Sequence, residues 1–400
     1  MSRDRIARRD FMKGAVAAGA GASVMTGAAH GAEEAPQEAA LVPRKKLGKT
    51  GAEVPIVLMG GSQKFDPTYD KRLHRAFQMG CYYLDTAQAY AGGQSQKTIA
   101  PFVKQIGDRK KLWITSKVCL LGDAANAQNF KKNFDTCLRD LDTEYLDMFF
   151  MHMVKEERLL EPEFIKMGDE LKKSGKTKFF GFSCHDGNVV ELMNKAAKVG
   201  GIDAIMFRFN FRQYGDVQLN QAIDNCKAAG IGLIAMKTQA SVPDDQEKVL
   251  GFQSKNFTLG QAKLKSVWAD ERIDAAVSGM TNVQLVQENC SAAASPVQLT
   301  MNEFTQLNRL AALTAASHCK GCSNICESKI NGHLKIADAM RYLMYFESYH
   351  EPETARELYN ALPALERDYD GVDFSEASRA CPQGIDIERR LRAAREHMLA

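Results

Sequence analysis

Four ionisable side chains close apolar runs whose lengths suit buried strands. Asp85 follows Tyr-Tyr-Leu at 82–84 with Tyr90 five residues later, Lys117 follows Trp-Ile-Thr-Ser, and His152 follows Met-Phe-Phe-Met. An ammonium beside a phenol lowers the phenol pKa, and a carboxylate keeps that ammonium charged. An imidazole can hydrogen-bond a carbonyl oxygen. Each residue alone is equally compatible with a capping or surface role, but the set predicts polarisation of a ketone or aldehyde and protonation of its oxygen as hydride reaches carbon.

The elements that position these residues alternate between short apolar runs and amphipathic stretches. One predicted helix, residues 129–141, carries Phe130, Phe134, Cys137, Leu138 and Leu141 on one stripe. Eight strand–helix pairs predict an α/β protein with a (β/α)8 barrel, in which chemistry lies at the carboxyl ends of the strands. A doubly wound sheet is the alternative, but no G-x-G-x-x-G follows the first strand. The predicted strands are residues 54–59, 81–86, 112–118, 146–153, 179–184, 204–211, 231–237 and 274–279.

Four of the ten cysteines gather near the end of the chain. Cys319, Cys322 and Cys326 have the spacing C-x2-C-x3-C, and Cys381 precedes a proline. The remaining six are predicted to be buried free thiols: Cys81, Cys119, Cys137, Cys184, Cys226 and Cys290.

This tail resembles two bacterial ferredoxin runs, each half erased. In that pattern three cysteines of one run and the proline-flanked fourth cysteine of the other bind the same cluster. The resemblance implies one [4Fe–4S] cluster on Cys319, Cys322, Cys326 and Cys381. A four-thiolate zinc site and two disulfides are the alternatives.

Five segments resemble the aldo/keto reductase family across about residues 47–294. They are Leu-Gly-Lys-Thr-Gly at 47–51, Asp-Thr-Ala-Gln-Ala-Tyr at 85–90, Ile-Thr-Ser-Lys at 114–117, Met-Phe-Phe-Met-His at 148–152 and Gly-Lys-Thr-Lys-Phe-Phe-Gly-Phe-Ser at 175–183. The resemblance implies a catalytic tetrad of Asp85, Tyr90, Lys117 and His152, with Tyr90 as general acid. It also implies hydride transfer between NADP(H) and a small carbonyl or alcohol substrate.

The cofactor positions implied by the resemblance agree only in part. Ser183 matches a residue that holds the nicotinamide amide, and Gly279, Glu288 and Asn289 match the phosphate and adenine region. Cys184, Met206, Met236 and Leu285 depart from the family pattern at positions that otherwise bind the dinucleotide. Lost hydrogen bonds at such positions weaken binding, so NADP(H) is the least supported part of the prediction.

The start of the chain has the order of an export signal. Arg8 and Arg9 resemble the twin-arginine signal, and an uncharged Gly/Ala-rich run follows at 14–32. That run is only weakly hydrophobic, so we expect a cleaved signal, a periplasmic or otherwise exported protein, and no stable membrane anchor.

Charge and length complete the prediction. Residues 1–32 carry five basic and two acidic side chains, so the net charge of +3 belongs to them. A formally neutral remainder gives nucleic-acid binding no support. We expect a signal at 1–32, a barrel at 44–298 and a helical iron–sulfur tail at 299–400. The predicted function is an exported oxidoreductase with a possible redox partner protein. The alternative is a non-catalytic electron-transfer or binding protein whose barrel has lost the ability to bind NADPH.

Overall fold

The computed structural model describes residues 40–120, 125–330 and 333–399. Residues Ala40–Ala400 form one compact unit. The predicted signal at 1–32 lies outside the described residues.

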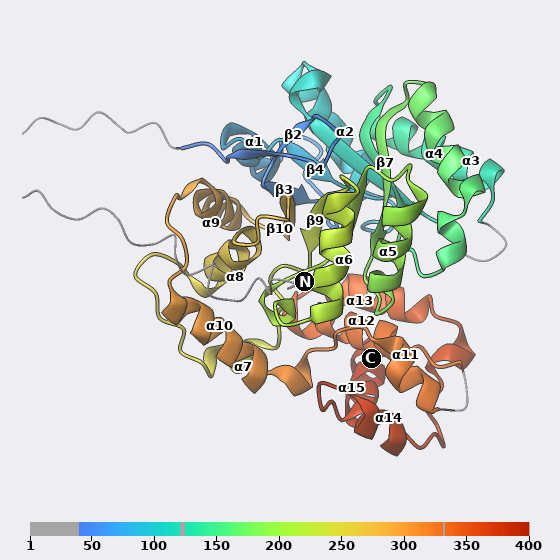
Figure 1. Ribbon diagram of the computed structural model, residues 1–400, viewed down its shortest axis with the longest axis vertical. Helices are drawn as coiled ribbons and strands as arrows, with labels where there is room; N and C mark the ends of the chain where they lie inside the picture. The colour runs from blue at the N-terminus through green and yellow to red at the C-terminus, as the bar shows by residue number, and fades with distance from the viewer. Residues whose placement is uncertain (1–39, 121–124, 331–332, 400) are drawn as a thin grey trace, which may run out of the picture. The chain divides into compact units, whose positions relative to one another are not determined.

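Eight parallel strands close into a barrel in the order β10-β3-β4-β5-β6-β7-β8-β9 (Figure 1). They are buried almost throughout, as expected for strands covered on both faces. The predicted (β/α)8 barrel is confirmed. Its strands are β3 (Val57–Gly60), β4 (Tyr83–Asp85), β5 (Trp113–Cys119), β6 (Leu146–His152), β7 (Thr177–Cys184), β8 (Ala204–Arg208), β9 (Gly232–Met236) and β10 (Ala275–Gly279).

Two predicted strands differ from the observed ones. The run at 54–59 divides, because β2 (Glu53–Pro55) pairs antiparallel with β1 (Arg44–Lys46) before the barrel strand begins. The run at 204–211 ends early, at Arg208. There the Asn210 side chain accepts a hydrogen bond from Arg212 N and starts a short 3-10 turn, η4 (Phe211–Gln213), which diverts the chain from the sheet.

The helices of the barrel follow the predicted apolar stripes. All five stripe residues of the helix predicted at 129–141 are buried on α3. Gly80, Gly175 and Gly230 adopt positive φ at or just after helix ends, as left-handed closing residues do. The helices are α1 (Lys71–Gln78), α2 (Ser95–Ile106), α3 (Ala127–Leu141), α4 (Pro162–Lys173), α5 (Val189–Val199), α6 (Val217–Ala228), α7 (Asp244–Lys248), α8 (Leu259–Trp268) and α9 (Val283–Ala294).

A mainly helical extension follows the barrel, as predicted. Its first helix packs Leu307 and Leu310 into a cluster with Phe211, which follows β8. The later helices enclose a core of their own that contains Leu343 and Tyr359. The helices are α10 (Met301–Leu313), α11 (Ser323–Cys326), α12 (Ile336–Ser348), α13 (Pro352–Asn360), α14 (Ser375–Ala380) and α15 (Ile387–Leu399).

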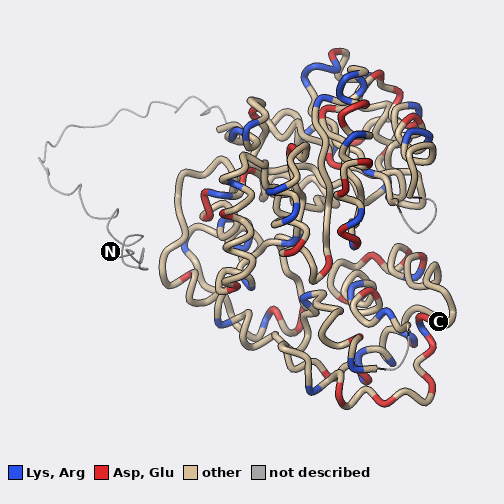
Figure 2. Tube along the Cα trace, turned by 45° about the vertical axis from the view of Figure 1, so that its right-hand side comes forward, with Lys and Arg blue, Asp and Glu red and all other residues tan. Residues whose placement is uncertain are grey.

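Residues of both charge signs are interspersed along the trace of the described residues (Figure 2). Blue and red segments alternate along the helices, as expected for a chain that is close to neutral overall. No helix in these ranges combines the length and the apolar character that a membrane crossing needs.

Candidate functional site

The barrel brings the four predicted catalytic residues to the carboxyl ends of adjacent strands. Asp85 is the last residue of β4, Lys117 lies near the end of β5, and His152 is the last residue of β6. Tyr90 belongs to the turn that follows β4. Because neighbouring parallel strands end at the same mouth, these side chains can meet there.

Lys117 is the centre of this group. Its Nζ donates to Asp85 Oδ2 at 2.8 Å, to the Thr86 carbonyl at 2.9 Å and to the Tyr90 hydroxyl at 3.2 Å. These three bonds use all three ammonium protons. The Lys117 side chain is fully buried and that of Asp85 is 3% exposed. These bonds fix the direction of the ammonium group, and one of its N–H groups points at the phenol oxygen of Tyr90.

The pKa of Tyr90 departs from the prediction. Burial raises it well above its usual value, and the charge of Asp85 adds to the rise. The sequence predicted a lowered pKa because it placed Lys117 beside the phenol but could not supply the burial. Tyr90 therefore holds its proton at neutral pH, and the bond from Lys117 is available to stabilise the phenolate after that proton leaves.

His152 lies against Tyr90 and is neutral. The two ring centroids are 5.3 Å apart, with an edge-to-face angle of 79°. Burial lowers the pKa of His152 well below its usual value, and the charge of Lys117 acts in the same direction. A neutral imidazole can donate to a carbonyl oxygen without adding charge to the site.

A cysteine that sequence reasoning assigned to the core joins this site. Cys119 is the register partner of His152 across β5 and β6, and its Sγ lies 3.6 Å from His152 Nδ1. The signal was present in the sequence, because residues two apart on a strand face the same side and Lys117 precedes Cys119 by two.

The extension contributes a second tyrosine to the mouth. Lys237, which follows β9, donates from Nζ to the Tyr345 hydroxyl of α12 at 2.8 Å and lies over its ring at 4.2 Å. The charge of Tyr345 also acts on the pKa of Tyr90, which places the two phenols in one electrostatic neighbourhood. Helix α12 is thus part of the wall around the predicted tetrad.

An ion-pair network holds α12 to the loops after β6 and β7. Asp338 accepts from Lys155 Nζ at 2.9 Å and also pairs with Arg341, and Arg341 lies 3.5 Å from Asp186. Asp338, Arg341 and Asp186 are each at least nine-tenths buried. The contacts of Asp338 with Lys155 and of Arg341 with Asp186 join residues far apart in sequence, so no local pattern could predict them.

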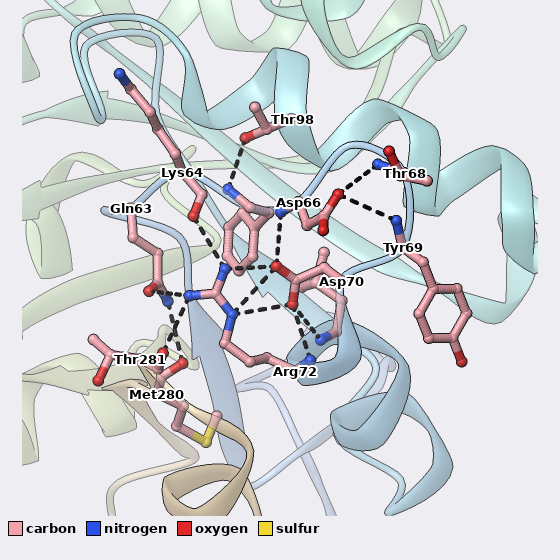
Figure 3. A network of polar contacts seen from close by, with 12 residues as sticks. Gln63, Lys64, Asp66, Thr68, Tyr69, Asp70, Arg72, Thr98, Met280 and Thr281 are labelled. Atoms are coloured by element: carbon pink, nitrogen blue, oxygen red, sulfur yellow. Dashed lines mark hydrogen bonds and ion pairs between the residues drawn. The ribbon is translucent and has the colours of Figure 1, made fainter.

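The opposite side of the mouth is held by a polar cluster around Arg72 (Figure 3). Its Nη1 donates to Gln63 Oε1 at 2.7 Å and to the Thr281 carbonyl at 3.3 Å. Gln63 in turn donates to the Met280 carbonyl at 3.3 Å. The loop after β3 is therefore tied to the turn after β10, where the barrel closes.

Of the predicted cofactor residues, Ser183 and Gly279 lie at the ends of β7 and β10, and Glu288 and Asn289 lie on α9. Most already have partners. Ser183 Oγ accepts from Met153 N at 3.1 Å, and Asn289 Nδ2 donates to Ser278 Oγ at 3.0 Å. Glu288 accepts from Gln284 Nε2 at 2.9 Å, whereas Gly279 faces open space.

At the nicotinamide end, Met206 and Met236 are buried and apolar. Tyr345 of α12 bonds to Lys237, the residue that follows Met236.

The four clustered cysteines line one pocket in the extension. All ten cysteines are free, so no disulfide joins them. The backbone N–H of Gly321, which has φ of +76°, points at Cys319 Sγ from 3.4 Å. Within the described ranges, no group of three or more His, Cys, Asp or Glu side chains forms a site for a single metal ion.

The loop that carries Cys319 and Cys322, called the cysteine loop below, packs directly against the barrel. A Cβ on Gly187, in the turn after β7, would lie 2.5 Å from the Cys322 Cα. Arg208, the last residue of β8, donates from Nη1 to the Cys319 carbonyl at 3.1 Å. The predicted strand at 204–211 ran past Arg208, so the sequence did not indicate that this cation ends a strand. The observed β8 ends at it.

Comparison with known proteins bears on the barrel. The model of the aldo/keto reductase family matches residues 58–243. This match covers just under half of the chain. The chain is similar to oxidoreductases of this family, and the part of the match that covers β4 to β6 contains all four predicted catalytic residues.

Individual relatives are distant. L-galactose dehydrogenase from Arabidopsis thaliana is 24% identical over 293 residues, which are 65% of this chain and 91% of that protein. An aldo-keto reductase from Gibberella moniliformis is 31% identical over 144 residues, but only 34% of this chain and 42% of that protein align. The holo form of an aldo-keto reductase from Bacillus halodurans superposes with a TM-score of 0.56 at 20% identity, covering 67% of this chain and 96% of its own. That likeness shows the fold.

Proposed function

We propose that this protein interconverts a small carbonyl compound and its alcohol at Asp85, Tyr90, Lys117 and His152. The observation that carries the proposal is the bond of 3.2 Å from Lys117 Nζ to the Tyr90 hydroxyl, in a buried site where Asp85 fixes the ammonium.

The four residues divide the work on the substrate oxygen. His152, neutral and edge-on to Tyr90, donates a hydrogen bond to the carbonyl oxygen and orients it. A nicotinamide dinucleotide, when bound, would supply the hydride to the carbonyl carbon. As negative charge develops on the oxygen, Tyr90 gives up its proton to it, and the ammonium of Lys117 stabilises the phenolate. Asp85 keeps Lys117 charged and aimed. In the oxidative direction the same phenolate accepts the alcohol proton.

Activity against a panel of aldehydes and ketones tests this function. Replacement of Tyr90 by Phe removes the acid while keeping the ring against His152, so turnover should be lost. Unchanged turnover in this variant would remove Tyr90 from the mechanism. Titration of NADPH and NADH against the purified protein tests the donor, and micromolar binding would support a dinucleotide-dependent enzyme.

The second part of the proposal is a single [4Fe–4S] cluster on Cys319, Cys322, Cys326 and Cys381. Its support is the shared pocket of the four thiols and the N–H of Gly321 aimed at Cys319 Sγ. Hydrogen bonds to cysteine sulfur are typical of such centres. The cluster would supply one-electron redox chemistry, with an external redox protein as a candidate partner.

Iron, zinc and acid-labile sulfide analysis of anaerobically purified protein decides between an iron–sulfur cluster and a four-thiolate zinc site. About four of each per chain would support the cluster. One zinc per chain without sulfide would establish the zinc alternative instead.

A specific observation favours a second candidate function, a non-catalytic electron carrier. Met206 and Met236 are apolar where a dinucleotide needs polar partners, and Tyr345 of α12 stands at the end of β9. The titration of both dinucleotides separates the candidates, because a carrier binds neither and turns over no carbonyl substrate.

Export by the twin-arginine route completes the proposal. Arg8 and Arg9 followed by the uncharged run at 14–32 support it. Replacement of both arginines by lysine keeps the charge and should retain the precursor inside the cell. Undiminished export of that variant would contradict the route.

A further inference from the structure

The structure leaves one buried cation without an opposite charge. Arg208 is 6% exposed. Within the described ranges no carboxylate pairs with it, and its Nε has no hydrogen-bond partner. A buried charge needs a partner, because removing it from water costs more than packing returns. A negatively charged group beside the guanidinium of Arg208 would offset this cost.

The surroundings of the guanidinium identify that partner. Its Nη1 donates to the Cys319 carbonyl, and a Cβ on Gly321 would lie 3.2 Å from its Nη2. The guanidinium thus faces the cysteine loop, from a strand that belongs to the barrel.

The other cations of the same cavity are already paired. Arg341 binds Asp338 and lies 3.5 Å from Asp186, and Arg390 donates to Glu347 at 2.6 Å. These two arginines line the cavity beside Cys319 together with Arg208. Only Arg208, of the three, lacks a carboxylate within the described residues.

We infer that Arg208 is the counter-charge that the barrel supplies to the cysteine-bound cluster, and that it raises the reduction potential of the cluster. The inference rests on the proposed cluster. Reduction adds one negative charge to a centre that is already anionic, and a fixed cation in a dry site stabilises the more negative state. Because Arg208 ends β8, the barrel would set the potential of a centre bound entirely by the extension.

Other charges near the cysteines modulate this effect without replacing it. Lys320 lies on the cysteine loop itself and is more exposed, so water screens it. Glu327 follows Cys326 in the chain, so a negative charge on it would oppose reduction, and its Oε1 accepts from Ala337 N at 3.0 Å. Neither contacts the Cys319 carbonyl, and neither comes from the barrel.

A redox titration monitored by electron paramagnetic resonance tests the inference on the anaerobically purified full-length holoprotein. Arg208→Met and Arg208→Gln should both shift the midpoint potential to more negative values, and Arg208→Lys should recover much of the wild-type potential. The matched control is the double variant Arg390→Met/Glu347→Gln. It removes a paired guanidinium from the same cavity without a change in net charge, so it should leave the potential unchanged.

Each outcome decides the matter. Potentials of Arg208→Met and Arg208→Gln equal to the wild type would overturn the inference while leaving the cluster intact. If these two variants assemble no cluster but Arg208→Lys does, the charge is required and the inference holds. If Arg208→Lys also fails to assemble, the arginine shapes the loop and the inference is wrong. Wild-type protein without iron and sulfide would overturn the proposed cluster itself.

Discussion

The thiol of Cys119 lies 3.6 Å from Nδ1 of His152, across the register pair that joins β5 to β6. Burial raises the pKa of Cys119 to about 11 and lowers that of His152, so both groups are neutral at physiological pH. A neutral thiol can donate to Nδ1, which leaves the imidazole proton on Nε2. Cys119 is therefore placed to fix the tautomer of His152.

Replacement of Cys119 should show this positioning role. Cys119→Val removes the donor at similar volume, and we expect kcat/KM to fall about fivefold to tenfold, as for one lost neutral hydrogen bond of about 1 kcal/mol. Cys119→Ser keeps a donor and should retain most activity. Nitrogen NMR of the imidazole should report a mixed tautomer in the valine variant only. A valine variant with wild-type kinetics and tautomer would refute the role.

Tyr90→Phe should lower kcat by about two to four orders of magnitude, the usual range for loss of a positioned acid. The cluster spectrum should not change, because Tyr90 contacts no cysteine of the extension. Since burial raises the pKa of Tyr90, wild-type carbonyl reduction should stay level through neutral pH and fall only under alkaline conditions. A pH profile of kcat/KM that falls already between pH 6 and 8, about the histidine range, would contradict this assignment.

The buried pair of Lys117 and Asp85 should matter for stability as well as catalysis. Lys117→Met leaves a fully enclosed carboxyl without its cation, so we expect a loss of about 3–5 kcal/mol in the free energy of unfolding. The double variant Lys117→Met/Asp85→Leu removes both charges and should recover most of that stability without any activity. Urea unfolding measures both. Equal destabilisation in the single and double variants would argue against a charge-based cause.

Docking of α12 should depend on pH through Asp338. Burial opposes ionisation, but Arg341 and Lys155 outweigh it and hold the pKa of Asp338 below its usual range. A depressed folded pKa gives stability that is complete above the unfolded value of about 3.9 and is lost as pH falls through the folded value. Asp338→Asn should therefore flatten the acid limb of a thermal-stability profile. The control is Asp370, an exposed carboxylate that pairs with Arg395. Asp370→Asn should leave the acid limb nearly unchanged.

Two glycine variants test whether the contact of the cysteine loop with the barrel is needed for the cluster. Gly187→Ala would place a Cβ 2.5 Å from the Cys322 Cα, so the loop must move and cluster content should fall. Gly215→Ala meets nothing within 4 Å and should load normally. Iron and sulfide content per chain reads out both. Full loading of the Gly187 variant would show that contact of the loop with the barrel is not needed for the cluster.

Local pattern alone determined the barrel and the positions of its chemistry. The short apolar runs predicted the strands, and the strands of such a barrel present their carboxyl ends at one mouth. Asp85, Lys117 and His152 could therefore be found without coordinates. The same logic applies to Arg208, but it failed there because the chain leaves the sheet at a turn set by Asn210 rather than by hydrophobicity.

Tertiary structure decided the electrostatics and the role of the extension. The direction of the Tyr90 pKa depends on how deeply the phenol is buried, which spacing along a chain does not encode. The contacts of Tyr345 with Lys237, and of Arg208 with the cysteine loop, join residues more than a hundred positions apart. Such pairs form only after both the barrel and the extension have folded, so the sequence by itself predicted two units and the structure brings their residues to one mouth.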